Sequence, residues 1–240
     1  MATNNARKEE LEELELKVKK LELAKLREEV KEQKQLARSA QYMADDHELS
    51  LLYRTRSFEM SQVRSRHRRI YLSGVVDDDM SAYVRSDLLS WEHQDEMEER
   101  EPSEVMVIIN SPGGFVTEGL EIYDTLMEYR AKGWTINTRC TGSAMSMAAV
   151  LLQAGERREM TPRATFMFHE ISAGYFGNTS EIKNRLKYTE SLQDHLSHIL
   201  ASRSNVSYKE IQEMWANKDV FLTATETYEK GFVDGITAEP

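Results

Sequence analysis

A serine surrounded by small residues is the first candidate for chemistry in this sequence. Ser146 stands in the stretch TGSAMSMAA of residues 141–149, at the expected start of an apolar helix. A nucleophilic serine needs small neighbours so that a substrate can reach its oxygen, and a helix N-terminus stabilises the negative charge that develops. A helix cap formed by Ser143 or Ser146 is the alternative, and the local pattern leaves it open.

A histidine that follows an apolar run is the candidate base. His169 comes directly after residues 164–168 (ATFMF), which we expect to form a strand, and α/β sites gather at the ends of such strands. A histidine with a purely structural role is the alternative. The remaining histidines lie in polar segments or on expected helices and are interpreted as solvated: His47, His67, His93, His195 and His198.

Two further features are candidates, and each is weak alone. Gly113 and Gly114 end the stretch NSPGG, where a strand is expected to turn into a helix, and glycines there let a ligand approach main-chain N–H groups. Such groups can bind a developing oxyanion, although an ordinary turn explains the same residues. Asp219 precedes the apolar run Val220–Leu222, and nothing local favours catalysis over a role in a turn.

Composition restricts the classes of protein. The 240 residues carry a formal net charge of −10, which argues against a nucleic-acid-binding surface because an acidic protein repels phosphates. The single cysteine, Cys140, excludes an intramolecular disulfide and fits a reducing compartment. The N-terminus has no apolar core for a signal peptide, and the longest nearly apolar stretch, residues 144–152, is far shorter than the about 20 residues that span a bilayer. We therefore expect a soluble, cytoplasmic protein.

The N-terminal part predicts a long helix. Residues 6–40 contain no Gly or Pro and are dominated by Glu, Lys, Leu and Arg, which are strong helix formers. Leucines and valines seven residues apart form an apolar stripe beside charged faces, a pattern compatible with a coiled coil. We interpret residues 1–45 as a helical arm for oligomerisation or docking, with a solvated helix lying on its own domain as the alternative, and residues 46–66 as a connector.

Strand and helix patterns alternate over residues 67–240, which predicts a layered α/β domain. The run VMVIIN of residues 105–110 is typical of a strand buried on both faces, and residues 92–101 are expected to form an acidic loop. Other strands are expected over residues 69–74, 135–139 and 164–168, and helices over residues 79–91, 146–154, 179–203 and 208–216 and from the paired glycines to residue 130.

Six stretches resemble, in this order, the proteolytic subunit of the Clp protease family: IYLSGVVDDDMSAYV, INSPGGFVTEGLEIYDTL, GSAMSMAAVLLQAG, ATFMFHE, GNTSEI and DVFLTATETYEKGFVDGI. The resemblance covers residues 69–236. It implies the layered β-β-α superhelix of Clp proteases and crotonases, a serine endopeptidase activity, and chemistry without a metal or cofactor.

Carried over to this sequence, the family motifs imply a catalytic triad. Ser146 would be the nucleophile, His169 the general base and Asp219 the group that orients the imidazole. Backbone N–H groups of Gly114 and Met147 would form the oxyanion hole.

The resemblance also implies a groove in which a peptide substrate binds as an added strand. Its residues would be Gly113, Phe115 and Val116 on one side and Glu170 and Ile171 on the other. The last two stand where the family usually has Gln-Pro, so the shape and charge of the groove differ from the family pattern.

Family members assemble into rings, and the helix that begins at Thr179 resembles the element that joins two rings. The resemblance therefore implies a homo-oligomeric ring that acts on proteins or peptides. The implied partner is an ATP-dependent AAA+ unfoldase or, for a relative of the phage head-maturation proteases, a scaffold or capsid protein. No nucleic acid or membrane is expected as a partner.

Two other functions fit parts of the same pattern. Crotonase-like acyl-CoA enzymes share the fold and bind a thioester enolate with two backbone N–H groups, without a triad. A non-catalytic assembly protein would keep the fold and use the helical arm for binding. The serine among small residues, followed by a histidine at a strand end, favours the peptidase.

Overall fold

The computed structural model describes Lys25, Lys31, Lys34 and residues 67–102, 104–216 and 218–238. The chain divides into two units, Met1–Ser61 and Gln62–Pro240, and the sheet with its helices belongs to the second. The expected helix over residues 6–40 and the connector over residues 46–66 lie outside the described residues, apart from the three lysines.

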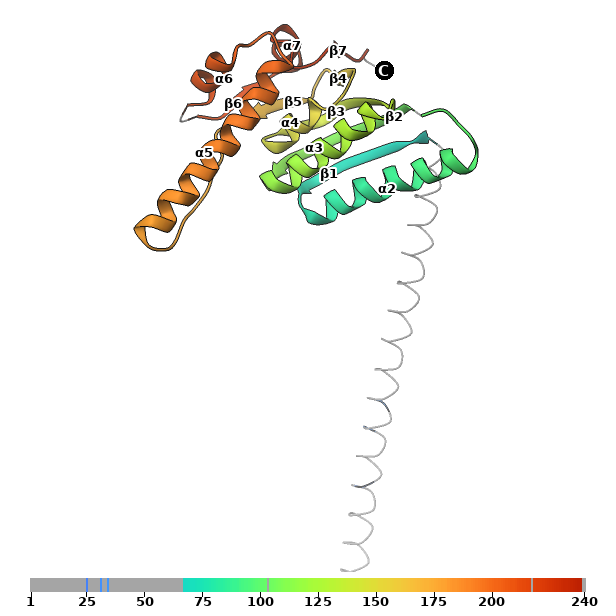
Figure 1. Cartoon of the computed structure of the whole chain (residues 1–240), viewed down its shortest axis with the longest axis horizontal. Coiled ribbons are helices and arrows are strands. Elements are labelled where there is room, and N and C mark those ends of the chain that lie inside the picture. Colours follow the sequence, from blue (N-terminus) through green and yellow to red (C-terminus); the bar gives the residue numbers. More distant parts are fainter. Residues whose placement is uncertain are drawn as a thin grey trace, which may run out of the picture. The chain divides into compact units, whose positions relative to one another are not determined.

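Parallel strands form the centre of the second unit (Figure 1). Within the described residues the strand order is β1-β2-β3-β4-β7, while β5 pairs with β3 in parallel and with β6 in antiparallel orientation. This sheet confirms the prediction of a mixed α/β domain. The strands are β1 (Arg69–Val76), β2 (Glu104–Gly114), β3 (Thr135–Met145), β4 (Arg158–Met160), β5 (Thr165–Phe168), β6 (Val220–Leu222) and β7 (Gly235–Ile236).

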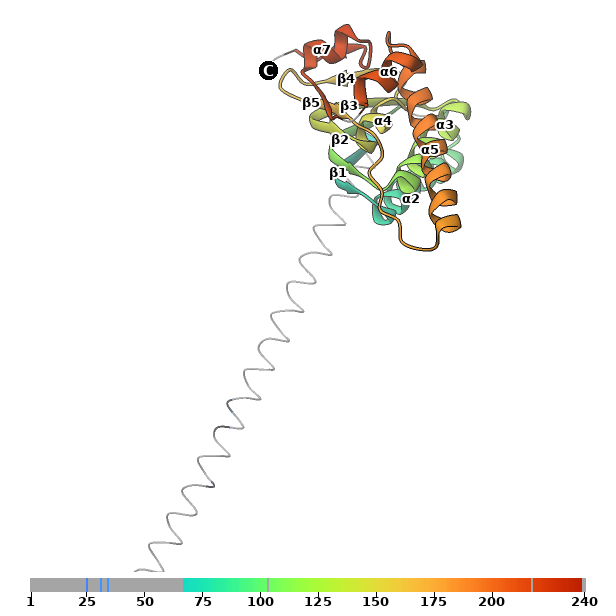
Figure 2. The same cartoon turned by 90° about the vertical axis from the view of Figure 1, so that its left-hand side faces the viewer.

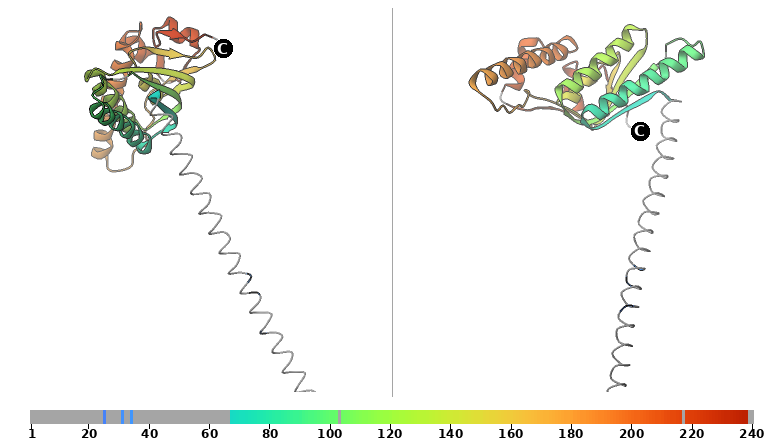
Figure 3. Two further views of the ribbon diagram at one scale, coloured as in Figure 1. Left: turned by 90° about the vertical axis from the view of Figure 1, so that its right-hand side faces the viewer. Right: turned by 60° about the horizontal axis from the view of Figure 1, so that its bottom comes forward.

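Helices pack against this sheet. Figure 3 shows α2 and α3 side by side, and Figure 2 shows α5 extending beyond the strands. The short helix α4 is buried along its whole length. In the described part of the chain, every helix is too short or too polar for a membrane span. The helices are α2 (Asp78–Met97), α3 (Val116–Ala131), α4 (Met147–Leu152), α5 (Thr179–Ser202), α6 (Tyr208–Trp215) and α7 (Ala224–Glu229).

Strand β2 has one face that is buried completely and one that is buried in part. Val105, Val107 and Ile109 are fully buried, whereas Met106 and Ile108 between them are half-buried. Successive side chains of a strand point to opposite faces, so this alternation shows that only one face is completely covered. The prediction of a strand buried on both faces is therefore wrong for the second face.

The acidic segment 92–101 begins as helix, which corrects the prediction of a loop. Helix α2 continues through Glu92 and ends at Met97. Asp95 is buried, and its carboxylate accepts hydrogen bonds of 2.7 and 2.5 Å from the two terminal guanidinium nitrogens of Arg68. Because this buried position is occupied by a carboxylate, apolar periodicity misses the last part of the helix.

Strands β2 and β3 extend further than predicted because their irregular ends stay paired in the sheet. The expected turn in NSPGG is wrong, since Gly113 and Gly114 pair with Val75 and Val76 of β1. Strand β3 likewise continues to Met145, next to the candidate nucleophile. By contrast, the predicted ends of α3, α5 and α6 and both ends of β5 agree with the structure to within one residue. The sequence did not predict β4, β6, α7 or β7, although the apolar run that forms β6 was noted.

Candidate active site

Two neighbouring parallel strands bring Ser146 and His169 to the same edge of the sheet. Met145, the last residue of β3, is paired with Met167 of β5. Ser146 follows β3, and its main-chain N–H donates a 2.8 Å hydrogen bond to the Met167 carbonyl. His169 follows the end of β5. The carboxyl ends of parallel strands are where α/β proteins commonly place their sites, and both side chains lie there.

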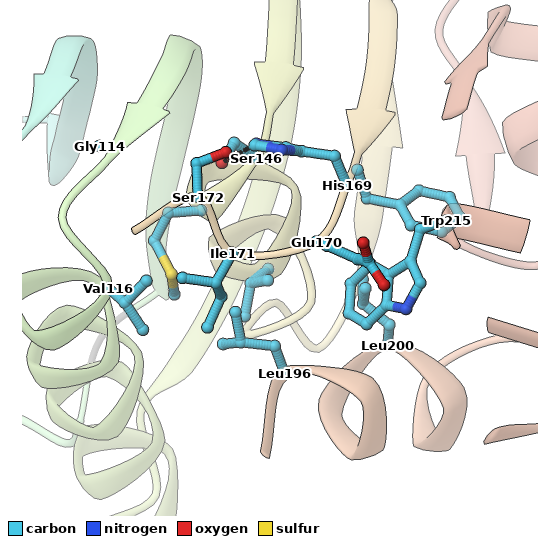
Figure 4. Close-up of a pocket in the computed structure, with 13 residues that line it drawn as sticks. Gly114, Val116, Ser146, His169, Glu170, Ile171, Ser172, Leu196, Leu200 and Trp215 are labelled. Carbon is cyan, nitrogen blue, oxygen red and sulfur yellow. Dashed lines mark hydrogen bonds between the residues drawn. The ribbon is translucent and has the colours of Figure 1, made fainter. Parts of the chain in front are cut away.

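The two side chains are within hydrogen-bonding distance. Oγ of Ser146 lies 2.8 Å from Nε2 of His169, and Figure 4 shows them facing each other across the edge of the site. Ser146 has φ 53° and ψ −123°. A positive φ is unusual for a residue with a side chain and costs of order 1–3 kcal/mol, so the surrounding structure must hold it. Strained residues of this kind concentrate at functional sites.

Neither candidate serine caps the following helix, so the capping interpretation is wrong for both. Ser146 occupies the N-cap position of α4 but makes no capping hydrogen bond with its side chain. Ser143 lies within β3, where its N–H and Oγ donate to Oδ1 of Asn110 at 3.1 and 3.3 Å. The Ser146 hydroxyl is therefore directed to the histidine.

Asp219 reaches the site through the antiparallel pairing of β5 with β6. Phe168, the last residue of β5, is paired with Val220, the first residue of β6, so His169 after β5 lies next to Asp219 before β6. Oδ1 of Asp219 is 3.8 Å from Nδ1 of His169, which is longer than a hydrogen bond. The Asp219 side chain is 57% exposed and that of His169 is 24% exposed. The carboxylate is thus adjacent to the imidazole and remains accessible to solvent.

Gly113 packs its main chain against the serine. Gly113 has φ +93°, and a Cβ atom there would lie 2.6 Å from Cβ of Ser146 and 2.9 Å from N of Met147. Both values are below any normal contact, so glycine is required at this position. Gly114 follows and lines the same pocket as Ser146 and Met147. Main-chain groups of the glycine segment therefore border the serine.

A pocket of about 130 Å³ opens beside Ser146 and His169 (Figure 4). Of the groove residues implied by the resemblance, Val116, Glu170 and Ile171 line it. Gly113 and Phe115 do not, and the Phe115 side chain is 63% exposed. The lining is mainly apolar and comes from β2, α3, α4, β5, α5 and α6 and from the segment after β5. Its apolar members are Val116, Met147, Val150, Phe168, Ile171, Leu196, Leu200 and Trp215.

Several lining residues were missed by the sequence analysis. Leu196 and Leu200 come from α5, and their spacing of four on one helix face was a usable signal. Trp215 comes from α6 and packs against Phe168, with ring centroids 5.8 Å apart. No local pattern connects Trp215 to the histidine strand, so it could not have been assigned to the site from its neighbours in sequence.

The other histidines do not join this site. His67, His93, His195 and His198 are exposed, as predicted, and His47 lies outside the described residues. Among residues 67–238 as described, no group of three or more His, Cys, Asp or Glu side chains could hold a metal ion.

A family model described as Clp protease matches residues 53–240. The chain belongs to the Clp protease family. The match confirms the resemblance that the six stretches carry, and it begins within the segment interpreted as a connector. Clp proteases are peptidases that act on protein substrates and usually form oligomers.

Proposed function

We propose that this Clp protease family member is a serine endopeptidase with Ser146 as nucleophile, His169 as general base and Asp219 as the group that orients the imidazole. The observation that carries the proposal is the 2.8 Å contact between Oγ of Ser146 and Nε2 of His169. A nucleophilic serine needs a base at this distance, because its hydroxyl is unreactive until the proton can be taken.

The chemistry is acyl transfer in two halves. Nε2 of His169 takes the hydroxyl proton while Oγ of Ser146 attacks the carbonyl carbon of the peptide bond, forming a tetrahedral intermediate with a negative oxygen. The imidazolium then gives the proton to the departing amine as the C–N bond breaks, which leaves an acyl-enzyme on Ser146. Water, activated by the same imidazole, hydrolyses the ester and restores the serine.

We assign the oxyanion hole to the main-chain N–H groups of Gly114 and Met147. The support is that both residues line one pocket with Ser146, together with the close approach of Gly113 to the serine. In the same proposal, the peptide lies between Gly113–Val116 and Glu170–Ile171 as an added strand.

The pocket beside the serine suits the side chain that precedes the scissile bond. Its volume of about 130 Å³ and its apolar lining match a leucine, methionine or phenylalanine side chain better than a charged one. Glu170 adds a carboxylate to the lining.

The family also supports assembly into a homo-oligomeric ring with a superhelical β-β-α domain in each subunit. We propose that residues 67–240 form this peptidase domain, residues 46–66 a connector and residues 1–45 an arm that acts in assembly or partner binding. The partner is then an AAA+ unfoldase or, in a capsid-maturation role, a scaffold or capsid protein. Deleting residues 1–40 is expected to change the sedimentation of the protein more than its hydrolysis of small peptides.

Turnover by the purified full chain tests the proposal. Wild type is expected to cleave casein and a fluorogenic leucyl peptide, and Ser146→Ala and His169→Ala are expected to abolish both while circular dichroism stays unchanged. Near-normal turnover by either variant contradicts the assigned roles. Tight binding of acyl-CoA without peptide cleavage would favour the crotonase-like alternative, and assembly without any turnover would favour a non-catalytic protein.

A further inference from the structure

A buried serine lies where β2 changes its alignment with both neighbouring strands. The pairing of β2 with β1 shifts between Asn110 and Gly113, where β2 contains one extra residue. Its pairing with β3 shifts between Ile109 and Ser111. Ser111 belongs to both irregularities, and it is 0% exposed. At such a bulge some main-chain groups lose their regular ladder partners and need other ones.

The hydroxyl of Ser111 supplies two of these partners. Its Oγ donates a 2.6 Å hydrogen bond to the Gly74 carbonyl of β1 and accepts a 3.1 Å hydrogen bond from the N–H of Gly113. A hydroxyl can donate and accept at the same time, which a methyl group of similar size cannot do. Ser111 therefore connects the glycine segment of β2 to the neighbouring strand.

The glycine that Ser111 holds is the one that packs on the nucleophile. The main chain of Gly113 lies so close to Ser146 that a Cβ atom would be 2.6 Å from that of the serine. The next peptide carries the N–H of Gly114, which lines the pocket. A small rotation of the Gly113 peptide would redirect the Gly114 N–H away from a developing oxyanion, and displacements of about 1 Å can cost about 100-fold in rate.

We propose that Ser111 is a positioning residue for the oxyanion hole. It acts through Gly113 and Gly114, without touching the substrate, by fixing the orientation of the peptide that presents the Gly114 N–H. The inference rests on the proposed serine peptidase function and deepens it, because it explains why the strand bulge occurs directly before the paired glycines.

Kinetics of Ser111→Ala in the full-length protein test this role. With a fluorogenic leucyl peptide, kcat is expected to fall roughly 10- to 100-fold and KM to change by less than about threefold, because an oxyanion contact strengthens only in the transition state. Ser111→Cys keeps a group that both donates and accepts, more weakly than a hydroxyl and with a larger atom, and is expected to lower kcat by a smaller factor than Ser111→Ala.

Inhibitor binding separates positioning from general loss of structure. A peptide boronic acid forms a tetrahedral adduct on the serine, and its affinity is expected to fall by the same factor as kcat in Ser111→Ala. The affinity for the cleaved product peptide, which places no oxyanion in the hole, is expected to stay within about threefold of wild type. Parallel losses of both affinities would overturn the proposal in favour of a merely structural role.

Thr227→Val is the matched control, because Thr227 is also 0% exposed and its hydroxyl donates a 2.6 Å hydrogen bond to a main-chain carbonyl, that of Thr223, outside the pocket. It is expected to lower the unfolding temperature and leave kcat unchanged. If wild type is active and both Ser111→Ala and Ser111→Cys keep its kcat, this inference alone is overturned. If wild type is inactive and a serine-reactive probe does not label it, the proposed function is overturned, and this inference with it.

Discussion

The carboxylate of Asp219 lies 3.8 Å from Nδ1 of His169, and more than half of its side chain is exposed to solvent. A carboxylate in this position interacts with an imidazolium through water-screened attraction and not through a direct hydrogen bond. The contact between the histidine and the serine is shorter, at 2.8 Å, and His169 is more buried. The proposed triad is thus unequal, with one close pair and one looser pair.

This difference between the two pairs predicts that substitution of His169 and substitution of Asp219 lower kcat by different factors. His169→Ala removes the general base and is expected to lower kcat by about 1000-fold or more, whereas Asp219→Asn is expected to lower it by roughly 10- to 100-fold. Steady-state hydrolysis of one fluorogenic peptide by both variants measures the ratio. Equal losses would show that Asp219 closes on the histidine during catalysis and would contradict the looser pairing.

The glycine segment predicts a steric requirement at a single position. Gly113→Ala is expected to reduce kcat/KM by more than about 100-fold, because the added methyl group would meet Ser146 and because φ +93° is unfavourable for alanine. Gly235→Ala is the control, since a Cβ atom there meets nothing within 4 Å. Peptide hydrolysis by the two variants, compared at matched folded fractions, checks the prediction. A Gly113→Ala protein with wild-type activity would rule out the close packing described for the site.

The apolar pocket predicts the residue that precedes the cleaved bond. Peptides with leucine, methionine or phenylalanine there are expected to be cleaved at least about tenfold faster than peptides with aspartate, because the apolar lining does not replace the hydration of a carboxylate and Glu170 repels it. Mass spectrometry of a digested peptide library gives the preference directly. Cleavage mainly after acidic residues would exclude this pocket as the binding site of that side chain.

A buried arginine outside the site predicts a pH-dependent contribution to stability. Burial acts to raise the pKa of Asp234, but hydrogen bonds from the side chain and main chain of Arg158 outweigh it and lower that pKa below its usual value. The guanidinium is almost completely buried, and the carboxylate is 41% exposed. A carboxyl group with a lowered pKa stabilises the fold above its unfolded pKa, near 3.9, and loses this effect as the pH falls through the folded value.

Asp234→Asn is therefore expected to lower the urea midpoint at pH 7 and to differ progressively less from wild type as the pH falls below about 3.9. Urea unfolding of both proteins at several pH values measures this difference. A deficit of the same size at pH 7 and pH 3 would contradict an ionised pair as its cause.

The close pair of the site could be predicted because its signals are local. Ser146 is marked by small neighbours and His169 by the apolar run before it, and both patterns end at the edge of a parallel sheet. Asp219 has no such mark, because its place depends on the antiparallel pairing of β6 with β5. Ser111 likewise gains its role only from contacts with Gly74 on another strand.

In the fold, too, the features with a local sequence signal could be predicted, and those that depend on contacts with distant residues could not. The helix α5 begins with Asn178 and Glu181 in a capping box, and its start was predicted. Thr223 and Glu226 form an equivalent box at α7, so that helix could have been predicted from the same signature. Asp95 could not have been assigned to a buried helix face, since its burial depends on the guanidinium of Arg68, which comes from a distant part of the sequence.

The central claim is that Ser146 is a nucleophile activated by His169, and mapping of a fluorophosphonate probe tests it most directly. The probe reacts with a serine only when a base removes its proton. Mass spectrometry of the labelled, digested protein is expected to place the adduct on Ser146 in wild type, with no adduct there in His169→Ala. Absence of labelling in folded wild type, or an adduct on another serine, would contradict the claim.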